Sequence, residues 1–204
     1  MKYILPLLAL TVVSTLATAN SILIKDADIY TSLGVFSKTH LYIENGKIVA
    51  MGQQVPLAAD LEIDGLGKSV TAGLFNSSTQ LGTVEVGAIE QTVDFYSENE
   101  TVTASLRIAE AFNPRSTLIP HNRVHGLTHS LLIPRSATNL FAGQVALVQL
   151  GNQPKVIHQS LAVALDFTER GVSIAGGSRA AALVQLRQAL DDAKDFSRNR
   201  KAAL

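Results

Sequence analysis

The chain has 204 residues, of which 47% are hydrophobic, so it can bury a sizeable core. Its 17 basic and 17 acidic residues balance without a long run of one sign, which argues against a nucleic-acid partner or an acidic membrane surface. Cysteine is absent, so disulfides cannot stabilise the fold. Tryptophan is absent too, which disfavours carbohydrate or base recognition by aromatic stacking.

The N-terminus has the three parts of a secretory signal peptide. Lys2 precedes the apolar run 4–13, and Ala17-Thr18-Ala19 has the small residues of a cleavage site. We expect residues 1–19 to be a signal peptide cleaved after Ala19, and the mature protein to be periplasmic or secreted. An uncleaved anchor is the alternative, but the apolar run is shorter than the roughly 20 residues that cross a bilayer.

Short β-strands are predicted for the first part of the mature chain. Separate apolar runs occur at residues 22–24, 27–30, 40–43 and 61–64. Asn45-Gly46 between alternating apolar stretches is typical of a type I′ hairpin, because both central residues of that turn have positive φ. Residues 68–75 predict a mostly apolar strand buried on both faces.

Helices and strands are expected to alternate further along the chain. Ser97 and Glu100 form a capping-box pattern, followed by apolar residues at helical spacing up to Phe112. Residues 130–133 predict a second buried parallel strand, and residues 139–151 an inserted β-hairpin. Ser178 is the expected N-cap of a long C-terminal helix.

Residues 70–82 read V-T-A-G-L-F-N-S-S-T-Q-L-G. This segment resembles a signature of the amidohydrolase superfamily, V-x-P-G-L-I-D-x-H-x-H-x-G. Residues 41–69 also resemble the hairpin and strand that precede it in that superfamily. Downstream, Phe112-Asn113-Pro114, Gly143-Gln144 and Gly176-Gly177-Ser178-Arg179 resemble a secreted bacterial, imidazolonepropionase-like branch.

The resemblance implies an α/β composite amidohydrolase fold. Residues 20–69 would form a β-sandwich portion, and residues 70–204 the first part of a (β/α)8 TIM-like barrel. A complete barrel typically needs about 250 residues. We therefore expect the 204 residues to be the N-terminal part of a longer protein, and to be poorly soluble by themselves because half a barrel exposes strand edges.

The resemblance also implies where chemistry would take place. The superfamily uses a divalent metal such as zinc at the C-terminal face of the barrel, held in part by two histidines of the first strand. Ser78 and Gln80 stand at those two positions, and Asn76 replaces the aspartate. Serine and glutamine are poor zinc ligands. No metal ligand or catalytic residue is therefore predicted in this chain, and Asn76, Ser78 and Gln80 are candidates for lining a substrate pocket.

His121, His125 and His129 occur at four-residue intervals, which on one helix would bring them together. Pro120 and Gly126 argue against a continuous helix, so structural histidines around a loop are favoured. His129 remains a pocket candidate because it precedes the second predicted strand.

Two classes of function follow. One is a hydrolase of non-peptide C–N bonds, such as those of a cyclic amide or imidazolone, with metal ligands supplied by later strands. The other is a non-catalytic periplasmic protein that binds a ligand or partners an active amidohydrolase homologue. Expected partners are a small-molecule substrate or ligand, and a second copy of the chain or an active homologue.

Overall fold

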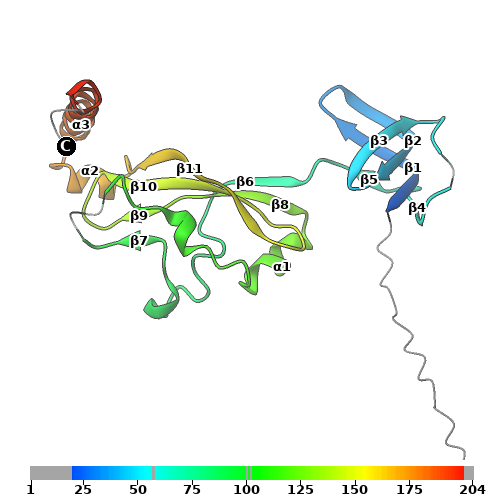
Figure 1. The fold of residues 1–204 in the computed structure, drawn as a ribbon, viewed down its shortest axis with the longest axis horizontal. Coiled ribbons are helices and arrows are strands. Elements are labelled where there is room, and N and C mark those ends of the chain that lie inside the picture. The colour runs from blue at the N-terminus through cyan, green and yellow to red at the C-terminus, as the bar shows by residue number, and fades with distance from the viewer. Residues whose placement is uncertain (1–19, 57, 100, 102, 200–204) are drawn as a thin grey trace, which may run out of the picture. The chain divides into compact units, whose positions relative to one another are not determined.

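A computed structural model describes residues 20–56, 58–99, 101 and 103–199 (Figure 1). The predicted signal peptide lies outside the described residues. The chain divides into two compact units, Met1–Ala72 and Gly73–Leu204. This division falls three residues after the predicted 69/70 boundary.

The first unit contains a five-stranded sheet built around β1 (Ser21–Thr31). β2 (Gly34–Glu44) pairs antiparallel with β1, and β3 (Lys47–Gly52) pairs antiparallel with β2. β4 (Leu61–Asp64) and β5 (Ser69–Val70) pair with β1 in parallel, one after the other along it. The β-sandwich portion, which needs a second sheet packed on this one, stays a prediction.

Local turn chemistry and a small apolar core explain the hairpins. Asn45 and Gly46 have φ values of 51° and 74°, which confirms the predicted type I′ turn between β2 and β3. Ala27, Ile29 and Leu41 form the buried core of the sheet.

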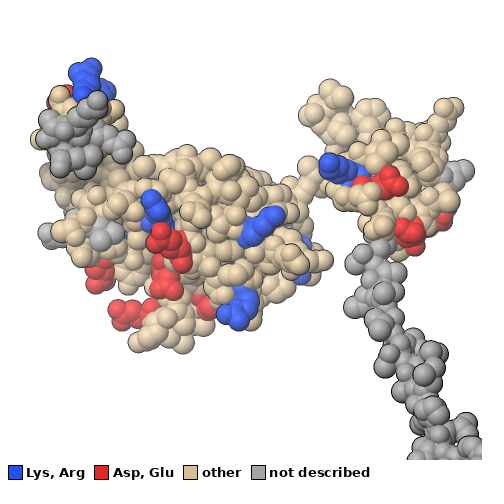
Figure 2. All heavy atoms as spheres, in the orientation of Figure 1, with Lys and Arg blue, Asp and Glu red and all other residues tan. Residues whose placement is uncertain are grey.

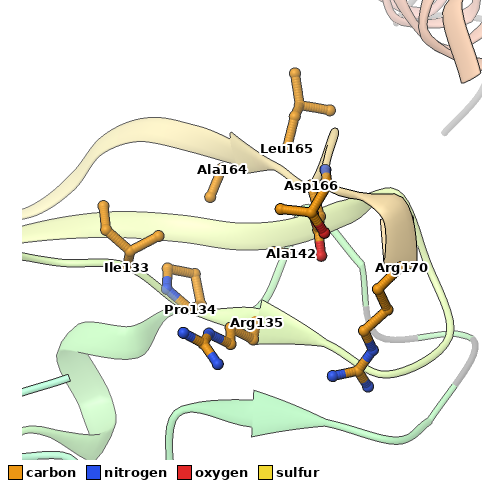
Figure 3. A pocket seen from close by; sticks show the side chains of 9 residues that line it. Ile133, Pro134, Arg135, Ala142, Ala164, Leu165, Asp166 and Arg170 are labelled. Carbon is orange, nitrogen blue, oxygen red and sulfur yellow. Dashed lines mark hydrogen bonds between the residues drawn. The ribbon is translucent and has the colours of Figure 1, made fainter. Parts of the chain in front are cut away.

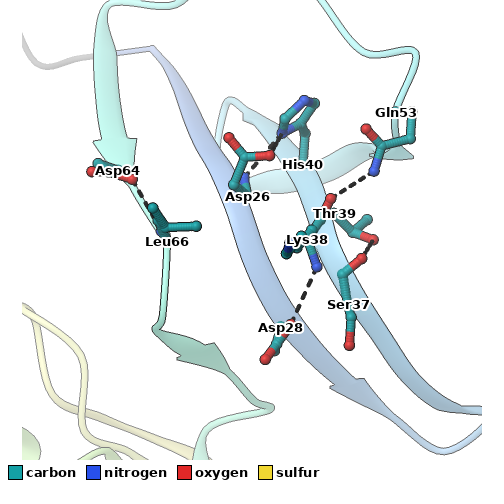
Figure 4. A network of polar contacts seen from close by, with 9 residues as sticks. All are labelled: Asp26, Asp28, Ser37, Lys38, Thr39, His40, Gln53, Asp64 and Leu66. Carbon is teal, nitrogen blue, oxygen red and sulfur yellow. Dashed lines mark hydrogen bonds and ion pairs between the residues drawn. The ribbon is translucent and has the colours of Figure 1, made fainter.

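The predicted break between strands 22–24 and 27–30 is a bulge within one continuous strand (Figure 4). Asp26 has a φ of 55°, and its backbone N–H donates to His40 Nδ1 at 3.0 Å. On β2, Lys38 has a φ of 48°, and its N–H donates to Asp28 Oδ1 at 3.2 Å. Gln53 Nε2 donates to the Lys38 carbonyl at 2.6 Å. Side chains therefore bind the backbone groups that the irregular ladder leaves unpaired.

The second unit contains a four-stranded sheet in the order β11-β10-β8-β6. β6 (Leu74–Thr79) and β8 (Leu127–Leu132) are parallel, and they overlap only in part with the strands predicted at 68–75 and 130–133. β10 (Phe141–Gln149) runs antiparallel to both β8 and β11 (Lys155–Leu165). β7 (Tyr96–Ser97) and β9 (Arg135–Ser136) form a separate parallel pair.

The second unit also contains helical segments of different lengths. They are the 3₁₀ helices η1 (Glu90–Thr92) and η2 (Ile108–Ala111) and the α-helices α1 (Leu118–Arg123), α2 (Glu169–Ile174) and α3 (Arg179–Asn199). Ser178 Oγ accepts a hydrogen bond from the Ala181 N–H at 3.1 Å, which confirms Ser178 as the N-cap of α3. The main core comprises Leu81, Ile108, Ile119, Leu132, Ala146, Val148 and Leu150.

Three predicted elements are corrected by the structure. The strand expected at 68–75 is divided between β5 in the first unit and β6 in the second, and Leu74 and Phe75 are exposed rather than buried. The prediction of a helix after the capping box is wrong, because Ser97 belongs to β7 and, of the described residues between 97 and 112, only Ile108–Ala111 is helical. The hairpin expected at 139–151 is larger, extends to Leu165, and belongs to the main sheet.

The sheet has a mixed topology. β10 pairs with Leu132 to His129 along the edge of β8 that faces away from β6. The described residues therefore contain an α/β arrangement with one parallel strand pair, and they form no closed barrel.

Candidate functional site

The candidate residues lie on the parallel pair β6 and β8. Asn76 of β6 pairs with Ser130 of β8, whereas Phe75 pairs with His129. Successive side chains of a strand point to opposite faces. His129 therefore lies on the other face of the sheet from Asn76, and the structure does not bring these two candidates together.

Asn76 and Gln80 line one cavity of about 210 Å³. Its wall is completed by Thr79, Leu81, Val84, Leu118, Asn122 and Leu127. The ladder between β6 and β8 has an irregularity between Asn76 and Thr79, where β6 carries one extra residue. This bulge turns Thr79 to the face of Asn76, and Gln80, which follows the end of β6, also lines the cavity.

Amide groups supply most of the polar surface of this cavity. Asn76 Oδ1 accepts from the Ser78 N–H at 3.0 Å, and Gln80 Nε2 donates to the Ile133 carbonyl at 3.3 Å. Asn122 Nδ2 donates to the Leu118 carbonyl at 2.8 Å. These contacts fix the orientation of each amide. Among the described residues, these contacts leave N–H donors on all three amide nitrogens and the side-chain oxygens of Gln80 and Asn122 without a protein partner, in a wall lined by uncharged residues.

Ser130 adds a buried hydroxyl beside Asn76. Its side chain is fully buried, and within the described residues its Oγ has no hydrogen-bond partner. Such a group carries a desolvation cost.

Ser78 is exposed and is not part of the cavity. Ser78 and Gln80 therefore do not converge on one point. Their neutral oxygens are also weak ligands for zinc. This pair does not fit a divalent metal. Within the described ranges, no group of three His, Asp or Glu side chains could hold a metal ion.

The other histidines lie outside this cavity. His129 Nδ1 is 3.0 Å from Thr128 Oγ1. The rings of His121 and His125 lie edge to face, with centroids 5.6 Å apart. α1 ends at Arg123, so the three histidines do not share one helix, in agreement with the prediction from Pro120 and Gly126.

Sequence reasoning missed Leu118, Asn122 and Leu127 as cavity residues. Asn122 is an ordinary residue of a six-residue helix, and only the packing of α1 against β8 places it near β6. The residues around Asn122 form no pattern that would predict a cavity residue at this position.

No protein-family model matches the sequence, and no curated protein matches it. A solved structure of an amidohydrolase from Thermotoga maritima MSB8 is similar, with a TM-score of 0.74 and 19% sequence identity. The match covers 89% of this chain and 50% of that one, so the chain spans about half the length of the matched protein. The described part of the chain includes no helix long and apolar enough to span a bilayer. The likeness shows that the chain has an amidohydrolase-like fold.

Proposed function

We propose that this protein is a relative of the imidazolonepropionase-like amidohydrolases in which the end of the first barrel strand binds a small neutral ligand without a metal. The observation that carries the proposal is the cavity of Asn76, Gln80 and Asn122, in which three amides line a wall that has no charged side chain.

The cavity chemistry favours a ligand with both carbonyl and N–H groups, such as a cyclic amide or imide. Among the described residues, Asn76 Nδ2 has no acceptor and can donate to a ligand carbonyl, and Gln80 Oε1 and Asn122 Oδ1 have no donor and can accept from a ligand N–H. Leu118 and Leu127 offer apolar contact to a ring. The volume of about 210 Å³ lies below the roughly 300–1,000 Å³ of typical ligand pockets, which favours a single small ring.

Hydrolysis of a non-peptide C–N bond is the second candidate. It is favoured by the fold likeness to an amidohydrolase. Such a reaction would need imidazole and carboxylate groups around a metal, which the described residues do not bring together.

Binding of succinimide and 2-pyrrolidone, a cyclic imide and a cyclic amide, tests the first candidate. We expect Asn76→Ala and Gln80→Ala each to weaken binding by roughly 2- to 10-fold in calorimetric or NMR titrations, as expected for the loss of one hydrogen bond. Gln188→Ala is the matched control, because Gln188 is exposed on α3. Equal affinity in all variants would reject the cavity as the binding site.

Ring opening separates the two candidates. The protein is incubated with either compound, with and without added zinc, and the free carboxylate product is measured. Product formation above the protein-free rate, in proportion to bound zinc, would reject the proposal of metal-free binding and support hydrolysis. Binding without product formation supports the non-catalytic reading.

We also propose that the protein is exported, cleaved after Ala19, and works in the periplasm as a homo-oligomer or beside an active homologue. N-terminal sequencing of the exported protein is expected to begin at Asn20. A chain that retains Met1 in the membrane fraction would contradict cleavage.

A further inference from the structure

Two adjoining cavities of the second unit share a pair of arginines. The cavities measure about 310 Å³ and 300 Å³, and Arg135 and Arg170 line both. None of their lining residues belongs to the cavity at the end of β6. The two arginines therefore belong to a second candidate binding site, which does not depend on the function proposed for the cavity at the end of β6.

Arg135 is held in place by its backbone and by an aromatic ring. Its N–H donates to the Phe95 carbonyl at 2.9 Å, and the residue pairs with Tyr96 across β9 and β7. Its guanidinium carbon lies 5.7 Å from the centre of the Phe95 ring, within the range of a cation–π contact. Its neighbours Pro134 and Ser136 are buried, so β9 is anchored on both sides of the exposed side chain.

Arg170 reaches the same region from α2. Figure 3 shows both side chains beside the first cavity, with that of Arg135 lying below Pro134 and that of Arg170 descending from α2. No ion pair joins either guanidinium to a carboxylate within the described part of the chain. The guanidinium groups of Arg135 and Arg170 thus border the same two cavities, and their planar N–H donors form no ion pair with a carboxylate of the described residues.

Two carboxylates lie nearby and are not paired with these arginines. Asp166 Oδ1 accepts from the Thr168 N–H at 2.9 Å and from the Thr168 hydroxyl at 2.6 Å, so this carboxylate orders the approach to α2. Glu98 is exposed at the second cavity and forms no ion pair with another described residue. Neither carboxylate therefore takes the place of an external anion on the guanidinium groups.

The first cavity also has an apolar wall. Ile133, Pro134, Ala142, Ala164 and Leu165 line it beside the two arginines. A cavity with an apolar wall and a few convergent polar groups is the usual form of a small-molecule site.

We propose that Arg135 and Arg170 bind the oxyanion group of a small organic ligand, a carboxylate or a phosphate, whose apolar part lies against Ile133 and Leu165. Guanidinium groups match the planar oxygens of these anions through paired N–H donors. The Phe95 ring orients one guanidinium before the ligand arrives, which reduces the entropy lost on binding.

Titrations of the purified protein with sodium hexanoate and with inorganic phosphate test this site. Arg135→Gln and Arg170→Gln are each expected to weaken the bound probe by about tenfold or more, because each removes a charge-assisted hydrogen bond. Arg187→Gln, at an exposed arginine of α3 without an ion pair among the described residues, is expected to change affinity less than twofold. If Arg135→Gln does not fold, Arg135→Lys tests the same contact, because it retains the positive charge but loses the paired N–H donors of the guanidinium group.

The two probes distinguish the two sources of the oxyanion. Binding of hexanoate indicates a carboxylate ligand with an apolar chain, and binding of phosphate alone indicates a phosphate group. The proposal is overturned if neither probe binds the unsubstituted protein at 10-millimolar concentrations (roughly −3 kcal/mol). It is also overturned if both arginine variants bind as tightly as the Arg187→Gln control.

Discussion

At the scale of single residues, the carboxylate of Asp60 holds the start of β1. Its Oδ2 accepts from the Asn20 N–H, the Ser21 N–H and the Ser21 hydroxyl, each at 2.9 Å. The pKa of Asp60 lies below its ordinary value of 3.8, first because of the Ser21 hydroxyl and then because of the Ser21 and Asn20 N–H groups. If the signal peptide is cleaved after Ala19, the Asn20 nitrogen becomes a charged α-amino group beside this carboxylate.

We predict that Asp60→Asn lowers the melting temperature at pH 7. A lowered pKa in the folded state means that the carboxylate stabilises the fold above pH 3.8. That stabilisation is lost as the pH falls through the folded-state pKa. The difference in melting temperature between the two proteins should therefore shrink at pH 3. Glu44→Gln, at an exposed position of the same sheet, is the control, and a difference that is independent of pH would contradict the prediction.

The candidate pocket shows what residue spacing can and cannot predict. Asn76, Ser78 and Gln80 would share one face of an ideal strand. The bulge between Asn76 and Thr79 ends that alternation, so Thr79 lines the cavity with Asn76 and Ser78 does not, and Gln80 lines it from the turn after β6. A bulge depends on the fit between β6 and β8, which lie far apart in the sequence.

At the scale of elements, predictions based on local chemistry were confirmed more often than predictions based on spacing alone. Asn45-Gly46 and Ser178 act through bonds within a few residues, and both are confirmed. The capping box at Ser97 was outweighed by tertiary pairing. Ser97 pairs with Ser136, and its Oγ accepts from the Asn99 N–H at 3.1 Å instead of starting a helix.

Ser178→Ala is predicted to weaken the start of α3. The Ser178 hydroxyl satisfies one N–H of the first turn, and loss of such a cap typically costs about 1 kcal/mol. α3 buries only Ala182 completely, so tertiary packing compensates little. Faster amide exchange in residues 179–182 is the expected result, measured by hydrogen exchange with mass spectrometry.

Ser197→Ala is the control for this helix, because Ser197 lies at the exposed far end of α3. Equal exchange of the first turn in Ser178→Ala and in the unsubstituted protein would show that the cap contributes nothing.

At the scale of the whole molecule, the pairing of strands could be predicted from the sequence only in part. The strands predicted at 68–75 and 130–133 overlap the parallel pair β6 and β8 only in part, whereas β10 was expected to lie in an insertion. Instead β10 occupies an edge of β8 through four residue pairs. Which strand pairs with which edge is decided by long-range contacts, and apolar periodicity does not specify it.

The edge strand β11 leads to a prediction about association. Leu161, Val163 and Leu165 are exposed by 51%, 46% and 37% on the last strand of the four-stranded sheet. Exposed apolar edge strands tend to pair with other chains, because their backbone N–H and C=O groups lack strand partners and their apolar side chains remain in contact with water. We therefore expect the 204-residue chain to associate as its concentration rises, measured by light scattering after size-exclusion chromatography.

Leu161→Lys combined with Val163→Lys should reduce this association, because charged side chains on an edge strand oppose pairing. Gln185→Lys combined with Gln188→Lys adds the same charge to exposed positions of α3 and is the matched control. A larger effect of the β11 pair than of the α3 pair locates the contact on β11, since both variants change the net charge equally. A chain that stays monomeric over the whole concentration range would refute this account of the β11 edge.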